Sequence, residues 1–88
     1  MTGGRFEIIM ERRARKNLAA LDPAVRRRVA ACIDSLAASP KPPGVAEVKG
    51  RPGVLRIRAG DYRILYEVRH EQLVVLVIEI GHRREIYR

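Results

Sequence analysis

The residues from Leu55 to Arg69, LRIRAGDYRILYEVR, constrain the fold of this chain more than any other stretch. Two alternating runs meet at Gly60-Asp61, and a glycine at the first position of a two-residue turn accepts the positive φ that hairpin turns require. The sequence therefore predicts a β-hairpin whose register follows from counting outward from this turn. The expected cross-strand pairs are Ala59 with Tyr62, Arg58 with Arg63, Ile57 with Ile64 and Leu55 with Tyr66.

Alternation of side chains gives this hairpin two different faces. The face expected to join the core carries Leu55, Ile57, Tyr62, Ile64, Tyr66 and Val68. The opposite face carries Arg56, Arg58 and Arg63. Like charges paired across a ladder are destabilising, whereas guanidinium groups match the geometry of phosphate oxygens. The three arginines therefore indicate a phosphate-binding face, and a solvated outer surface is the alternative.

The composition favours a small basic protein with an acidic partner. The chain has 88 residues, enough for a single domain spanning residues 1–88. It carries 18 Lys and Arg against 10 Asp and Glu, for a net charge of +8, and all but three of the basic residues are arginine. This balance indicates binding to a nucleic acid, to an acidic protein, or to both.

Cysteine use and hydropathy indicate where the protein resides. Cys32 is the only cysteine, which excludes an internal disulfide and fits a reducing cytosol. There is no Cys/His cluster, and we predict neither a metal site nor a cofactor. No apolar run approaches the roughly 18 residues of a membrane helix, and no signal-peptide pattern opens the chain. We therefore predict a soluble, cytoplasmic protein with no membrane partner.

The segments before the hairpin predict one strand and two helices. Residues 5–10 alternate apolar and charged side chains, as a strand does. Residues 11–21 have apolar residues at helical spacing but no good N-cap. A second helix is expected from Asp22-Pro23 to about Ala38, because aspartate caps helices and proline suits the first helical position. Residues 39–53 hold four of the five prolines and form a connecting loop.

The segment after the hairpin predicts the central strand. Residues 73–80, LVVLVIEI, are an almost unbroken apolar run, with Glu79 as the exception. Such a run is typical of a strand that is covered on both faces. The order of elements is then β-α-α-β-β-β, and it predicts an α+β fold. We expect a small, mostly antiparallel four-stranded sheet with an α-helical hairpin packed on one face.

Two segments in this order, RAGDYRILYEV and GHRREIY, resemble the RelE/ParE superfamily of toxins from type II toxin–antitoxin systems. The resemblance extends from Phe6 to Arg88. It implies a compact sheet with helices on one face and a toxin that a cognate antitoxin neutralises. RelE-like members are ribosome-dependent ribonucleases that cut messenger RNA without metal. ParE-like members act on DNA gyrase and lack the ribonuclease residues.

The resemblance also implies a set of site residues. Carried over by motif, the RelE-like positions are Arg56, Arg58, Arg63, Arg83 and Tyr87. All five are filled, which favours the RelE-like branch. The sequence departs from the best-known RelE pattern in two ways: the first two positions are arginine rather than lysine, and the gap between the last arginine and the tyrosine is shorter. The residues that transfer protons are therefore not fixed by the resemblance.

The chemistry of metal-free RNA cleavage suggests a role for each residue. Attack of a 2′-hydroxyl on its own phosphate needs a base, positive charge on the phosphorane and an acid. We assign Arg58, Arg63 and Arg83 to the scissile phosphate. Further phosphate contacts are expected from Arg56, Lys49 and Arg84. His82 and Tyr87 are the candidates for proton transfer, although strand alternation could turn His82 away from Arg83.

The sequence thus predicts a metal-independent, ribosome-dependent mRNA endoribonuclease that leaves 2′,3′-cyclic phosphate ends and inhibits translation. The alternative is a ParE-like inhibitor of DNA gyrase that acts by binding, and a plain basic nucleic-acid-binding domain ranks third. The expected partners are an acidic cognate antitoxin, the ribosome and messenger RNA. Contact with DNA is expected only indirectly, through the antitoxin complex at its promoter.

Overall fold

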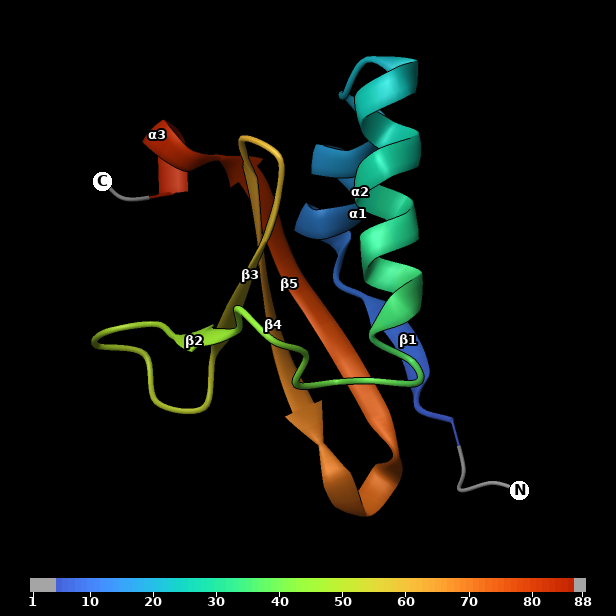
Figure 1. Cartoon of the computed structure of the whole chain (residues 1–88), viewed down its shortest axis with the longest axis vertical. Coiled ribbons are helices and arrows are strands. Elements are labelled where there is room, and N and C mark those ends of the chain that lie inside the picture. The colour runs from blue at the N-terminus through green and yellow to red at the C-terminus, as the bar shows by residue number, and fades with distance from the viewer. Residues whose placement is uncertain (1–4, 87–88) are drawn as a thin grey trace.

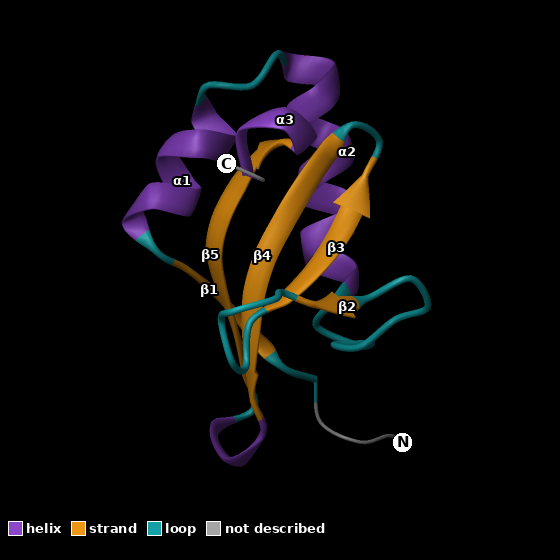
Figure 2. Ribbon diagram, turned by 90° about the vertical axis from the view of Figure 1, so that its left-hand side faces the viewer, coloured by secondary structure: helices purple, strands orange, loops and turns teal. Residues whose placement is uncertain are grey.

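The computed structural model describes residues 5–86, with side chains to residue 84, and shows one mixed sheet with helices on one face (Figure 1). The elements are β1 (Glu7–Met10), α1 (Arg12–Ala19), α2 (Pro23–Ser35), β2 (Ala46–Glu47), β3 (Leu55–Ala59), β4 (Tyr62–Arg69), a 3₁₀ turn (His70–Gln72), β5 (Val74–His82) and α3 (Arg83–Ile86). The strand order is β1-β5-β4-β3-β2. Helices α1 and α2 cover one face, while the opposite face is largely open (Figure 2).

The α+β class and the helical hairpin are confirmed, but the expected sheet of four strands is wrong in number. The fifth strand, β2, is two residues long and pairs antiparallel with Arg56 and Leu55 of β3. It lies within the segment expected to be only a connecting loop. The β1 strand pairs parallel with β5, and the other pairs are antiparallel. The β5 strand is an interior strand between β1 and β4, as its apolar run predicted, but the helices cover only one of its faces.

The register expected for the β3–β4 hairpin is confirmed at each of the four predicted pairs. Gly60 has a φ of 62°, the left-handed conformation that the turn requires and that glycine adopts without strain. The side chains of Ile64 and Tyr66 are fully buried against α2 residues in the core. Pairing and burial together place the apolar face of the hairpin toward the helices and the arginine face away from them.

The start of α2 is confirmed, and its end differs from the prediction. Asp22 is the N-cap residue and Pro23 the first residue of the helix, although the Asp22 side chain makes no capping hydrogen bond. The helix ends at Ser35 rather than near Ala38, and a turn leads into the proline-rich loop. Val29 and Ile33 of this helix are buried in the core. Among the described residues, no helix is both long and apolar enough to cross a membrane.

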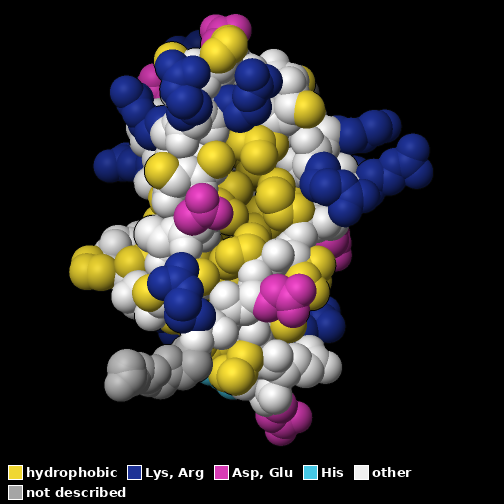
Figure 3. Space-filling model, turned by 90° about the vertical axis from the view of Figure 1, so that its right-hand side faces the viewer, with side chains coloured by type: hydrophobic (Ala, Val, Ile, Leu, Met, Phe, Trp, Pro, Cys, Tyr) yellow, Lys and Arg dark blue, Asp and Glu magenta, His cyan; other side chains and the backbone are white. Residues whose placement is uncertain are grey.

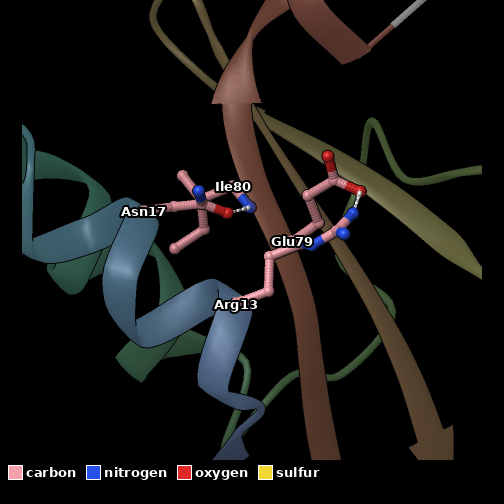
Figure 4. Close-up of polar contacts among 4 residues, drawn as sticks. All are labelled: Arg13, Asn17, Glu79 and Ile80. Atoms are coloured by element: carbon pink, nitrogen blue, oxygen red, sulfur yellow. Dashed lines mark hydrogen bonds and ion pairs between the residues drawn. The ribbon is translucent and has the colours of Figure 1, made fainter.

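Helix α1 covers the part of β5 that β1 leaves without a strand partner (Figure 4). The pairing of β1 with β5 ends at Met10 and Val77. Beyond that point, the side-chain oxygen of Asn17 accepts a hydrogen bond of 3.1 Å from the backbone N–H of Ile80. Ile80 is buried, so an N–H without an acceptor at this position would destabilise the folded state. A side chain of α1 therefore replaces a neighbouring strand at this position.

This contact predicts that Asn17→Ala destabilises the protein. The substitution leaves the Ile80 N–H without its acceptor, at a cost of about 1–2 kcal/mol in the free energy of unfolding. Urea denaturation followed by circular dichroism measures the change. Lys16→Ala, an exposed change on the same helix, is the control and should stay within about 0.5 kcal/mol of the wild type. Equal midpoints for the two variants would show that the Asn17 contact contributes nothing.

Candidate functional site

The arginine face of the hairpin forms one wall of a cleft. Arg56, Arg58 and Arg63 line it together with Ile57, Pro43 and Gly44, and its volume is about 370 Å³. Arg58 and Arg63 are directly opposite one another in the β3–β4 ladder. The Arg58 side chain is exposed, whereas Arg56 and Arg63 are half-buried. Three guanidinium groups therefore converge on a concave surface, which is the arrangement expected of a site for phosphate.

The second wall of the cleft comes from the proline-rich loop. The buried hydroxyl of Tyr66 donates a hydrogen bond of 2.6 Å to the carbonyl oxygen of Pro40. This bond fixes the loop to the core three residues before Pro43 and four before Gly44. Gly44 has a φ of 90°, which only glycine adopts readily. This wall has no local sequence signal, because the bond to Tyr66 joins residues that are 26 positions apart.

The Tyr66 phenol is a structural group rather than a site residue. Burial, assisted by the nearby Cys32, raises the pKa of Tyr66 to about 12. Burial also raises the pKa of the Cys32 thiol. Both groups therefore remain neutral at physiological pH. The Tyr66 hydroxyl keeps its proton and its bond to the Pro40 carbonyl.

The raised pKa predicts an alkaline loss of stability that Tyr66→Phe lacks. An ordinary tyrosine ionises near pH 10, so above that pH the unfolded state loses this proton while the folded state keeps it up to about pH 12. The stabilisation from Tyr66 is therefore full below pH 10 and is lost as pH rises toward 12.

Urea denaturation between pH 8 and 12 measures this difference. At pH 8, Tyr66→Phe should be less stable by about 1 kcal/mol, because it lacks the hydrogen bond to Pro40. The gap should narrow as pH rises from 10 to 12. Other titrating groups are common to both proteins and cancel in the comparison. A gap that stays constant over this range would contradict the pKa assigned to Tyr66.

The structure brings Arg83 and Arg84 close to the turn of the hairpin. Both residues open α3 and are exposed. The backbone N–H of Arg83 donates a hydrogen bond of 2.9 Å to the carbonyl oxygen of Asp61, which fixes the start of α3 beside the β3–β4 turn. Lys49 is different: it is exposed in the turn after β2 and does not line the cleft.

His82 lies on the other side of the sheet from Arg63. It pairs with Tyr62 across the β4–β5 ladder, and the two rings contact edge to face with centroids 5.5 Å apart. The Arg63 residue pairs with Gly81, one position along, so its side chain projects to the opposite face. The ring nitrogen Nδ1 of His82 accepts a hydrogen bond of 3.3 Å from the backbone N–H of Arg84. The other proton-transfer candidate, Tyr87, lies outside the described residues.

A second surface feature lies on the helical side of the molecule. Figure 3 shows apolar side chains exposed along a trough, with Lys and Arg side chains above it and beside it. The partly buried apolar residues of the helices and of the turn between them include Leu18 of α1, Leu21 of the turn and Val25 of α2. This surface therefore combines apolar area with Lys and Arg side chains above and beside it, and with Asp or Glu side chains at its edges.

Together, the fold and the arginine cleft define a class of small basic proteins with a helical hairpin on one face of a sheet. Solved structures of toxins with this fold match the chain closely. The RelE–RelB complex of Pyrococcus horikoshii matches with a TM-score of 0.78 and 26% identity, covering 90% of this chain and 96% of that one. The intact RelBE complex of E. coli matches with a TM-score of 0.75 and 28% identity, covering 88% and 95%.

The chain belongs to the RelE/ParE superfamily: the family model described as the ParE toxin of the type II toxin–antitoxin system parDE matches residues 8–87. A relative from Methanocaldococcus jannaschii that is named as the toxin RelE1 is 25% identical over 87 residues, which are 96% of this chain and 97% of that protein. The chain is thus a toxin of a type II toxin–antitoxin system, of the RelE type.

Proposed function

We propose that this toxin inhibits translation by cutting messenger RNA on the ribosome. The observation that carries the proposal is the cleft on the open face of the sheet, where Arg56, Arg58 and Arg63 converge. The start of α3 adds Arg83 at the adjacent end of the hairpin. A phosphodiester bound there would meet several fixed positive charges, which is the main requirement for stabilising a phosphorane.

The proposed reaction is an attack of the 2′-hydroxyl on the adjacent phosphate. Arginine stays protonated at every physiological pH, so the site arginines stabilise negative charge but do not accept protons. Arg58, Arg63 and Arg83 are assigned to the scissile phosphate and Arg56 to a neighbouring one. The reaction needs no metal ion and leaves a 2′,3′-cyclic phosphate on the upstream fragment. The ribosome would hold the message, because the chain has only four aromatic residues (Phe6, Tyr62, Tyr66 and Tyr87) on which bases could stack.

Inhibition of DNA gyrase is the second candidate. The family model named for the ParE toxin favours gyrase inhibition, because its match extends over most of the chain. The filled set of arginines supports the ribonuclease, because binding to gyrase gives no reason for several guanidinium groups to line one cleft. Cleavage of messenger RNA and supercoiling by gyrase, assayed side by side with the same preparation, distinguish the two activities.

The ribonuclease proposal predicts that Arg63→Ala and Arg83→Ala lose activity without unfolding. Each variant should cut messenger RNA on programmed ribosomes about 10²–10³-fold more slowly, since each lacks one charge that stabilises the transition state. Arg27→Ala is the matched control, because Arg27 is exposed on α2, on the other side of the sheet. Circular dichroism checks the fold. Wild-type rates in both site variants would mean that the reaction occurs elsewhere.

The products provide a separate check on the mechanism. Fragments should end in a 2′,3′-cyclic phosphate and a 5′-hydroxyl, which end-specific ligation and mass spectrometry identify. Treatment of the toxin with EDTA before its addition to ribosomes, at the magnesium level that ribosomes need, should leave the rate unchanged. Fragments with a 5′-phosphate would indicate that water, rather than the 2′-hydroxyl, is the nucleophile.

We also propose that an acidic antitoxin binds and neutralises the protein, because the solved structures to which it is similar include RelE–RelB toxin–antitoxin complexes. The apolar trough of the helical side and the Lys and Arg around it (Figure 3) suit an amphipathic segment with acidic residues on its flanks. Part of the +8 net charge would be neutralised in the complex.

Binding of the antitoxin should therefore weaken as salt is added. Charges near a protein surface are screened over about 10 Å at 0.1 M salt and about 3 Å at 1 M. Isothermal titration calorimetry at 0.05 M and 0.5 M salt measures the effect, and the heat-capacity change should be negative because apolar surface is buried. An affinity that is independent of salt would mean that the partner does not contact the basic residues.

A further inference from the structure

Glu79 is a carboxylate on the same face of the sheet as the arginine cleft. It pairs with Leu65 of β4, and Leu65 pairs in turn with Arg56 of β3. These three residues lie in one row across the open face. Strand alternation also puts Glu7 and Glu67 on that face, but they pair with β5 residues 74 and 76, at the other end of the strand. Among the described residues, Glu79 is the carboxylate of this face that lies diagonal to Arg63, whereas Glu67 lies diagonal to Arg56.

The register brings Glu79 within reach of the same nucleotide as Arg63. Arg63 pairs with Gly81, two residues along β5 from Glu79. The two are thus diagonal neighbours on one face, roughly 7–8 Å apart. Gly81, between Glu79 and the start of α3, has no side chain on that face. A glycine within a strand is typical of places where a ligand approaches the backbone closely.

The surroundings of Glu79 give it no strong structural role. It interrupts a run of apolar residues in the central strand, where a carboxylate is unfavourable. Its one ion pair in the described part of the chain is to Arg13 of α1, with 3.8 Å between Nη1 and Oε1, and the Arg13 side chain is 71% exposed (Figure 4). A pair this long and this exposed contributes little to stability. It does orient the carboxylate over the open face of β5.

We propose that Glu79 is the general base of the ribonuclease, an inference that rests on the proposed function. The arginines cannot accept a proton, and the His82 ring lies on the opposite face against Tyr62. A carboxylate beside phosphate-binding arginines supplies the missing acceptor.

The 2′-hydroxyl proton passes to Glu79 while the 2′-oxygen bonds to phosphorus, and the bond from phosphorus to the 5′-oxygen breaks. The 5′-oxygen takes a proton from water, and the Glu79 carboxylic acid returns its proton to the solvent.

The test is single-turnover cleavage of messenger RNA on programmed ribosomes from pH 5.5 to 9. Glu79→Gln should slow cleavage by about 10²-fold or more. The rates of the wild type and of the variant are compared at each pH. The charged groups nearest Glu79 are Arg13 from α1, and Arg63 and Glu67 from β4, with Arg56 one strand further away in β3. The three arginines stay charged over this range.

Two control variants separate catalysis from structure. Glu67→Gln changes a half-buried carboxylate on the same face that pairs with Arg69 at 3.2 Å, and it should keep the wild-type rate. Arg13→Gln breaks the ion pair of Glu79 but keeps the carboxylate, so it should keep most of the rate and the same pH profile. Glu79→Gln should also bind programmed ribosomes at least as tightly as the wild type, because it removes a negative charge beside RNA.

Three results would overturn the inference. If Arg13→Gln is as inactive as Glu79→Gln, the Arg13–Glu79 ion pair has a structural role and Glu79 is not the base. A wild-type rate in Glu79→Gln, with Tyr87→Phe inactive, would assign the base to the tyrosine and leave the proposed function intact. The third result is a wild-type protein that cuts no messenger RNA, together with an Arg63→Ala variant that binds ribosomes as the wild type does. It would rule out both the proposed function and this inference.

Discussion

The pairing of β3 with β4 is the interaction on which the rest of the structure depends. The turn at Gly60-Asp61 sets the register of this hairpin, and a shift by one residue would reverse the faces of one strand relative to the other. In that case Arg63 of β4 would no longer share a face with Arg56 and Arg58 of β3. Burial of Ile64 and Tyr66 in the observed register therefore exposes the arginines as a group. The cleft is a consequence of the same alternation that forms the core.

The parts of the fold that sequence could predict are those set by neighbouring residues. The hairpin, the start of α2 at Asp22-Pro23 and the interior strand β5 each have a local signal, and the structure confirms all three, although helices cover only one face of β5. The strand β2 has none, because it consists of Ala46 and Glu47 in a stretch rich in proline and glycine. It forms because β3 offers a free edge, which no window of sequence reveals. The same reason explains why the expected sheet had one strand too few.

The candidate site divides in a similar way. Alternation along the hairpin predicted the shared face of the arginines, and the cleft brings the three hairpin arginines together. The wall of Pro43 and Gly44 depends on a hydrogen bond from Tyr66 to the Pro40 carbonyl, 26 residues away, so no local sequence pattern predicts it. Glu79 did have a sequence signal, as a lone charge within an apolar strand. Its position on the arginine face depends on its pairing with Leu65, which the sequence did not predict.

The parallel pairing of β1 with β5 has a consequence for synthesis on the ribosome. Residues 7–10 have no strand partner until residues 74–77 are made, and Asn17 meets the backbone of Ile80 only then. Closing so long a loop is entropically costly and makes contacts of this kind late events in folding. An emerging chain that already carries its hairpin arginines still lacks its central strand. The protein therefore completes its fold, and with it the fixed geometry of the cleft, only after β5 has been made.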